Sequence, residues 1–274
     1  MFSTTDLDAY FDRIGYGGPT APTLATLAAL QVRQPDAIAF ENLDVLLGRP
    51  IQLDAAALHR KLVAQGRGGY CFEQNGLLLA VLRSLGFQAI GLAGRVRFNM
   101  PAERVTGRSH MMIRVDLPDG PYLVDAGFGG LTQTIPLAMV ADLEQASALD
   151  RHRLHPVPEQ GPGELMLQAW IDGEWSDVVR FAETPQLQID YEMASWFTST
   201  HPNSLFVGNL LATRTRADAR LRLFNDELTM RFADGHVDVR PLAGLADVIA
   251  VLRDEMRLNL DGLDLARLSR VIRS

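Results

Sequence analysis

The sequence has almost no cysteine and almost no lysine: Cys71 and Lys61 are the only residues of their kind. A single thiol cannot form a disulfide within the chain, so we expect a protein of a reducing compartment, the cytoplasm. Runs of about 18 apolar residues are also missing, and no membrane span is therefore expected. The N-terminal stretch MFSTTDLDAYFDRIG carries acidic residues early and has no apolar segment, which does not fit a signal peptide.

An excess of positive charge is missing as well, because the formal net charge is −7. This charge argues against nucleic acid as the main partner, but local charge can still accommodate a small anionic co-substrate. The sequence contains no HExxH or CxxC motif and no tight carboxylate cluster, so we expect no metal site. What is present is an ordinary globular composition, 274 residues with 47% apolar and 22% charged, which is enough for a core of normal size.

The first 86 residues favour helices. Apolar residues spaced three and four apart over residues 7–14 form one helical face, with Thr4 or Thr5 as the expected N-cap. A second apolar spacing begins at residue 24 and is expected to stop at Pro35. Residues 54–66 predict a third helix between an aspartate cap and a glycine, and a buried helix is expected to follow Cys71.

After residue 86, β-branched and aromatic segments alternate with turn signals, which is typical of antiparallel strands. Strands are expected at residues 90–98, 110–117, 122–125, 165–171, 175–181, 210–215, 220–224, 228–232 and 237–239, and helices at 245–258 and 263–272. The Asp172-Gly173 pair in WIDGEW is a strong hairpin turn. We interpret the polar, proline-bearing residues 142–164 as a connection. The order is therefore helices, then an antiparallel sheet or small barrel, then a mixed tail.

Cys71 is the first candidate for chemistry. A lone cysteine is most often a small buried apolar residue, but this one follows two glycines and an aromatic and directly precedes an amphipathic helix. A thiol at a helix N-terminus meets partial positive charge and free backbone N–H groups, which favour the thiolate and supply part of an oxyanion hole. Loop glycines, nucleophile and helix together are the arrangement that acyl transfer requires.

His110 and Asp125 are the expected partners of this thiol. His110 opens the apolar strand HMMIRV, and Asp125 closes the next strand, YLVD, across a short turn. Because the start of one strand lies beside the end of the next in an antiparallel hairpin, both side chains are expected at one edge of the sheet. An aspartate at this position is also a common turn former. Beside an imidazole, however, its carboxylate fixes the tautomer and stabilises the imidazolium.

These residues lie in motifs that resemble the arylamine N-acetyltransferases of the prokaryotic type. The matching motifs are FENLDVLLG (40–48), RGGYCFEQN (67–75), Ser109-His110, LVDAGFGG (123–130) and STHPNSLF (199–206). The spacing of Cys71, His110 and Asp125 is similar to that of the family's catalytic triad. The resemblance covers nearly the whole chain and is densest over residues 38–136.

The resemblance implies an α+β fold of three parts: an N-terminal helical bundle (1–86), a central antiparallel β-barrel (87–200) and a C-terminal α/β lid (201–274). It also implies a cysteine-protease-like core where the bundle meets the barrel. The family reaction is ping-pong. Acetyl-CoA acetylates the cysteine, CoA leaves, and an arylamine, arylhydrazine or N-hydroxyarylamine takes the acetyl group. In this sequence Cys71 would form the thioester, His110 would move the proton and Asp125 would hold the ring.

Binding residues follow from the same resemblance. Phe40, Phe128 and Phe206 match positions that line the acceptor pocket, and aromatic rings suit the flat face of an aromatic amine. Gly127, Gly129 and Gly130 match the turn where the backbone approaches the CoA pyrophosphate. GFGG alone is a weak signal, since no lysine follows it as in a Walker motif. Arg67 and Glu73 beside the nucleophile are expected to be structural, and Asn75 to orient the site.

Two alternatives remain open at this point. The first is another thiol enzyme, a papain-like or transglutaminase-like amidase, which shares the order of Cys71, His110 and Asp125. Acetyl transfer to an aromatic amine, as opposed to hydrolysis of a peptide amide, distinguishes the two. The second is a binding protein that keeps the fold and lacks activity, for which an unreactive Cys71 would be the sign.

Overall fold

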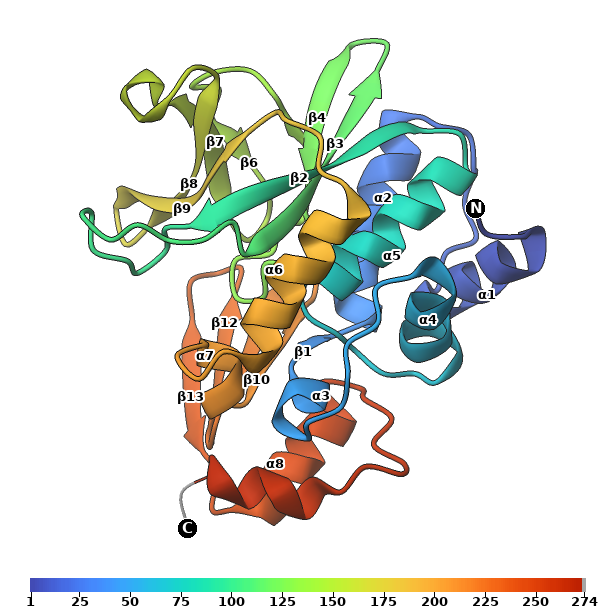
Figure 1. Cartoon of the computed structure of the whole chain (residues 1–274), viewed down its shortest axis with the longest axis vertical. Helices are drawn as coiled ribbons and strands as arrows, with labels where there is room; N and C mark the ends of the chain where they lie inside the picture. Colours follow the sequence, from blue (N-terminus) through green and yellow to red (C-terminus); the bar gives the residue numbers. More distant parts are fainter. Residues whose placement is uncertain (273–274) are drawn as a thin grey trace.

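The computed structural model describes residues 1–272, which form a helical part, a curved sheet and a C-terminal α/β part (Figure 1). The helical part comprises α1 (Thr4–Ile14), α2 (Leu24–Ala37), α3 (Leu43–Leu46), α4 (Ala55–Leu58) and α5 (Cys71–Ser84), with a π-helical turn (His59–Ala64) continuing α4. The N-cap of α1 is Ser3, one residue before the expected threonines, because the Ser3 and Asp6 side chains cap each other's backbone N–H groups. Asp54 caps α4 as predicted.

The prediction that Pro35 ends the second helix was wrong. Pro35 lies inside α2, which continues to Ala37. In the last turn of a helix a proline removes only one backbone hydrogen bond, and Ile38 N–H still bonds to the Gln34 carbonyl at 2.7 Å. The extra turn places residues 38–40 against the loop that precedes α5, which matters for the site described below.

The central sheet has eight antiparallel strands in the order β5-β4-β3-β2-β9-β8-β7-β6. The strands are β2 (Gln88–Val96), β3 (His110–Leu117), β4 (Gly120–Val124), β5 (Leu137–Ala138), β6 (Gln145–Ala146), β7 (Arg151–Pro156), β8 (Glu164–Ile171) and β9 (Glu174–Ala182). The Gln145 side chain bonds to both the N–H and the carbonyl of Ala138, so a side chain joins the two edge strands. The sheet is therefore a nearly closed barrel around an apolar core that includes Leu92, Met112 and Leu167.

The interpretation of residues 142–164 as a connection was wrong, because β6 and β7 lie within them. In β7 the inward positions are His152 and Leu154, which are buried, while Arg151 and Arg153, which alternate with them, face outward. A strand with an inward histidine and outward arginines is polar in composition, although every second side chain points into the barrel. The composition hid the period of two that defines the strand.

The C-terminal part contains α6 (Gln188–Thr200), α7 (Leu205–Gly208) and strands β10 (Leu211–Thr215), β11 (Ala219–Phe224), β12 (Glu227–Phe232) and β13 (Val237–Pro241). It ends with α8 (Leu245–Ala250), continued by a π-helical turn (Val251–Glu255), and a 3₁₀ segment (Leu265–Arg270). Strand β1 (Phe40–Glu41), from the helical part, pairs with β10 at the edge of this sheet. Figure 1 shows α6 running between the barrel and the C-terminal sheet, alongside α5.

The architecture confirms the predicted α+β class with a helical bundle, an antiparallel barrel and a C-terminal α/β part. The division at residues 86 and 200 stays a prediction. None of the helices within residues 1–272 combines the length and the apolar character that crossing a bilayer demands. For function, the important outcome is that the start of α5, the start of β3 and the end of β4 converge between the bundle and the barrel.

Candidate active site

Cys71 is the first residue of α5 and is 4% exposed. Its thiol donates to the Ser109 carbonyl with a sulfur–oxygen distance of 3.7 Å, so the sulfur lies directly beside the start of β3. The Glu73 carboxylate reaches back and accepts a hydrogen bond from the Tyr70 N–H at 3.0 Å. This contact fixes the loop that delivers the sulfur to the first turn of the helix, where N–H groups have no helical partner.

His110 and Asp125 meet at the edge of the barrel, as expected from the hairpin that joins β3 to β4. The distance from His110 Nε2 to Asp125 Oδ2 is 2.6 Å, and both side chains are buried. Because Asp125 occupies Nε2, Nδ1 is the ring nitrogen left for the Cys71 thiol, which is close enough to contribute to the raised pKa of the ring. The structure thus brings together the three residues that the sequence singled out.

The electrostatics of this cluster favour a charged imidazole. Burial alone would lower the pKa of His110, but the negative charge and hydrogen bond of Asp125, with a further contribution from Cys71, raise that pKa to about 10. At neutral pH the ring is therefore an imidazolium. A protonated ring beside a sulfur stabilises the thiolate, which is the nucleophilic form.

Asp125 is held by groups beyond the histidine. Asn75 Nδ2 donates to Asp125 Oδ1 at 2.9 Å and to the Met111 carbonyl at 2.8 Å, and the Gly127 N–H donates to the same carboxylate oxygen at 2.8 Å. Asn75 lies four residues after Cys71 and therefore on the same face of α5. One helix face thus presents the nucleophile and fixes the carboxylate that orients its partner.

The glycines after Asp125 occupy three different local environments. At Gly127 a Cβ would lie 3.0 Å from the Cys71 Cα, so a side chain here would crowd the first turn of α5, over which this turn passes. Gly129 has a positive φ of 85°, and its N–H donates to Thr132 Oγ1 at 2.8 Å. The N–H groups of Gly127 and Gly129 are therefore engaged within the protein. Gly130 lies beside the Arg222 side chain, which brings a cation to this turn.

The three predicted pocket aromatics lie around the cluster. Phe128 packs edge-on against the His110 ring at 5.1 Å between centroids, and Phe40 lies 5.9 Å from Phe206. Tyr70 joins them, with its ring 6.0 Å from that of Phe206. Tyr70 was not among the residues predicted to line the pocket, although its position directly before Cys71 was a signal. Backbone bonds between residues 39–41 and Gly69 hold Phe40 at the nucleophile loop.

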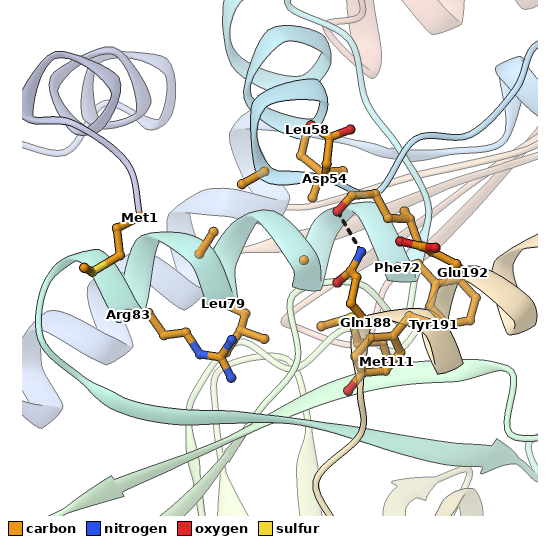
Figure 2. Close-up of a pocket in the computed structure, with 14 residues that line it drawn as sticks. Met1, Asp54, Leu58, Phe72, Leu79, Arg83, Met111, Gln188, Tyr191 and Glu192 are labelled. Carbon is orange, nitrogen blue, oxygen red and sulfur yellow. Dashed lines mark hydrogen bonds between the residues drawn. The ribbon is translucent and has the colours of Figure 1, made fainter.

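A separate cavity of about 370 Å³ lies between α4, α5 and α6 (Figure 2). Its lining includes Phe72 and Met111, each of which directly follows a residue of the cluster in sequence. Figure 2 shows Gln188 of α6 at this cavity, and its side-chain N–H donates to the Leu53 carbonyl at 3.1 Å. This cavity is distinct from the aromatic surfaces at Cys71. Within the part of the chain that the structure describes, no group of three or more His, Cys, Asp or Glu is placed to hold a metal.

Comparison with known proteins places this geometry in a family. Residues 23–265 match the N-acetyltransferase family. The arylamine N-acetyltransferase of Mycobacterium tuberculosis is 40% identical over 259 residues, which cover 93% of this chain and 90% of that protein. The Salmonella typhimurium protein named arylamine N-acetyltransferase / N-hydroxyarylamine O-acetyltransferase is 38% identical over 234 residues, covering 85% and 81%.

A solved structure agrees with these relatives. The Mycobacterium marinum arylamine N-acetyltransferase in complex with CoA superposes with a TM-score of 0.92 at 39% identity, covering 97% of this chain and 100% of that one. The chain is thus similar to these proteins in sequence, in fold and in length. The chain belongs to the arylamine N-acetyltransferase family of enzymes.

Proposed function

We propose that this enzyme transfers an acetyl group from acetyl-CoA to arylamines, arylhydrazines and N-hydroxyarylamines through a thioester on Cys71. The observation that carries the proposal is the position of a buried thiol at the start of β3, where the next residue is a histidine whose ring Asp125 holds at 2.6 Å. The names of the relatives, one of which includes N-hydroxyarylamine O-acetylation, and the CoA complex of the M. marinum protein support the substrates.

In the first half-reaction the Cys71 sulfur attacks the thioester carbonyl of acetyl-CoA. A bond forms between Sγ and the acetyl carbon, the bond from that carbon to the CoA sulfur breaks, and the His110 imidazolium gives its proton to the departing CoA sulfur. The developing oxyanion is stabilised by N–H groups at the start of α5, the Cys71 N–H among them. Asp125 keeps the ring in place throughout.

In the second half-reaction the neutral His110 takes a proton from the incoming amine. The amine nitrogen attacks the acetyl carbon, the bond from that carbon to Sγ breaks, and the cluster returns to its starting state. An arylamine has a low pKa and is already neutral and nucleophilic near pH 7, so mild base assistance is sufficient. The cycle balances without water, metal or redox cofactor taking part.

Substrate contacts follow from what surrounds the sulfur. The rings of Phe40, Phe128 and Phe206, joined by Tyr70, offer flat apolar surfaces for an aromatic acceptor. We assign the CoA pyrophosphate to the turn that contains Gly127, Gly129 and Gly130. Since the first two N–H groups have partners in the protein, the contacts would come mainly from the backbone at Gly130 and from the neighbouring Arg222.

Mass spectrometry of the intact protein tests both half-reactions. Acetyl-CoA alone should add the mass of one acetyl group to the peptide that contains Cys71, and an aromatic amine should then remove that group as the N-acetyl product. The Cys71→Ser variant is the control and should give no thiol-bound acetyl group. Failure of the parent enzyme to acquire the group would reject the thioester. Loss of the group to water at the same rate with and without amine would indicate a hydrolase.

A further inference from the structure

Five charged side chains, four of them buried and the fifth half-buried, form a network beside the nucleophile loop. They are Glu41, Asp44, Lys61, Arg67 and Glu73. We propose that Lys61 is a positioning residue for Cys71. Its side chain connects the ion pairs of Arg67 to the carboxylate of Glu73, which fixes the nucleophile loop. The inference deepens the proposed function and rests on it for the meaning of the rates.

The contacts form a continuous path. On one side, Arg67 donates to Glu41 at 3.3 Å and to Asp44 at 3.0 Å. Lys61 Nζ then contacts Asp44 Oδ2 at 2.7 Å and Glu73 Oε1 at 2.6 Å. The other oxygen of Glu73 accepts the Tyr70 N–H, one residue before the nucleophile. Within residues 1–272, Lys61 is the one cation shared by the two halves of this path.

The local backbone supports a dedicated role for Lys61. It lies in the π-helical turn His59–Ala64, where the Gln65 N–H bonds five residues back to the Arg60 carbonyl at 2.9 Å. Wide turns of this kind are rare and often occur at functional sites. The turn directs the only lysine of the chain inward, where its side chain is 15% exposed, while Arg60 next to it faces outward.

Removing the ammonium would change the state of Glu73. Burial raises the pKa of Glu73 above its ordinary value even though Lys61 lowers it, so loss of Lys61 raises that pKa further. Below the new pKa Glu73 is neutral and becomes a weaker acceptor for the Tyr70 N–H. The nucleophile loop then loses its anchor as the pH falls. A side chain with only a packing role would not produce this pH dependence.

The rate at which acetyl-CoA acetylates Cys71 is the measurement. We expect Lys61→Met to lower this rate by about 10- to 100-fold, as misplacement of a reacting atom does. Measured at about pH 8 and about pH 6, the loss should be larger at the lower pH, because the pKa of Glu73 is raised. Lys61→Arg keeps the charge and should restore most of the rate and the parent's pH profile. The matched control is Arg180→Met on the barrel, which removes a cation with 19% exposure, ion-paired to Glu164, and should leave the rate unchanged.

A double variant tests the route through Glu73. If Lys61 acts through this carboxylate, Lys61→Met should have little further effect on the rate in a Glu73→Gln background. An equal loss in both backgrounds, a rate for Lys61→Met equal to that of the parent at both pH values, or an equal loss in Arg180→Met would overturn the proposal. Should Lys61→Met fail to fold, Lys61→Gln and Lys61→Arg are compared instead, and equal rates for these two would overturn it.

A second readout separates this inference from the function on which it rests. Iodoacetamide alkylates Cys71 without any acyl donor, and its rate in Lys61→Met should fall relative to the parent with the same pH dependence. If the parent alkylates but does not accept acetyl from acetyl-CoA, the proposed function fails while the positioning role is still measured. If the parent is acetylated and the variants match it in both assays, only the positioning role fails.

Discussion

Asn75 and Asp125 are joined by a hydrogen bond of 2.9 Å between the amide Nδ2 and the carboxylate Oδ1. Through this bond, the helix that presents Cys71 also holds the carboxylate that orients His110. The amide oxygen of Asn75 accepts the Ala126 N–H at 3.0 Å, so the same side chain fixes the turn after Asp125. Orientation of the imidazole thus depends on the helix as well as on the barrel.

Replacing Asn75 should therefore weaken catalysis without removing the nucleophile. Asn75→Ala leaves Asp125 with the Gly127 N–H on Oδ1 and frees the carboxylate to rotate away from His110. We expect a loss of about 10- to 100-fold in kcat/KM for acetyl transfer, smaller than the loss for removing the carboxylate itself. Steady-state kinetics of Asn75→Ala and Asp125→Asn, measured side by side, show which variant loses more kcat/KM. An Asn75→Ala enzyme as fast as the parent would contradict the prediction.

Removing the sulfur is the most severe change. Cys71→Ala should abolish acetyl transfer, because the thioester has no other atom on which to form. The variant should fold normally, since alanine fits the buried first turn of α5 without strain. Circular dichroism and a product assay test the two statements together. Activity comparable to the parent in a correctly folded variant would disprove the nucleophile assignment.

Asp125→Asn should lower the acetylation rate by several orders of magnitude, about 10⁴-fold in comparable triads. The amide cannot stabilise the imidazolium, and burial would then keep the His110 ring neutral. Single-turnover acetylation of Cys71 is the measurement. A near-normal rate would show that Asp125 serves only the turn that follows it.

The His110–Asp125 pair also predicts how stability depends on pH. The pKa of His110 is raised from 6.5 to about 10 in the folded enzyme, so the folded state holds this proton more tightly than the unfolded chain. The resulting stability is fully present below about pH 6.5 and is lost as the pH rises through about 10. Urea unfolding across this window should show a falling free energy of unfolding in the parent and a flatter profile in Asp125→Asn. Parallel profiles would exclude the pair as the source.

Gly127 offers a test of packing at the site. In Gly127→Ala the new Cβ would lie 3.0 Å from Cys71 Cα, Asn75 Nδ2 and Gln74 Cβ, so the turn must move away from α5. We expect a destabilisation of about 1–3 kcal/mol together with reduced acetylation. Gly107→Ala is the control, because nothing lies within 4 Å of its Cβ position. Equal unfolding midpoints for the two variants would show that the turn accommodates the methyl group.

The residues nearest the chemistry were the most predictable from the sequence. Cys71, His110 and Asp125 could be assigned to one site from the sequence. A helix start after two glycines fixes the place of Cys71, and a short hairpin fixes those of His110 and Asp125. Strand β3 begins and ends where its apolar pattern does, and β8 ends directly before the Asp172-Gly173 turn while β9 begins directly after it. Their roles and the assignments of the aromatic and glycine contacts stay predictions.

What the sequence could not show depends on contacts between distant residues. Strand β1 is two residues long, and its strand partner β10 lies far away in the sequence. The polar composition of β7 concealed an inward face, and the π-helical turn at Lys61 has no signature in apolar spacing. Glu73 and Arg67 were expected to be structural, but their ionic partners, Lys61 for the first and Glu41 and Asp44 for the second, emerge only in three dimensions.

The pairing of β1 with β10 has a consequence for biosynthesis. Phe40 and Glu41 take their antiparallel partners from Thr213 and Ala212, which leave the ribosome long after the nucleophile does. During most of translation the growing chain therefore contains Cys71 but lacks β10, the strand that pairs with Phe40. The pairing of β1 with β10 can therefore form only after β10, in the last quarter of the polypeptide, has been made.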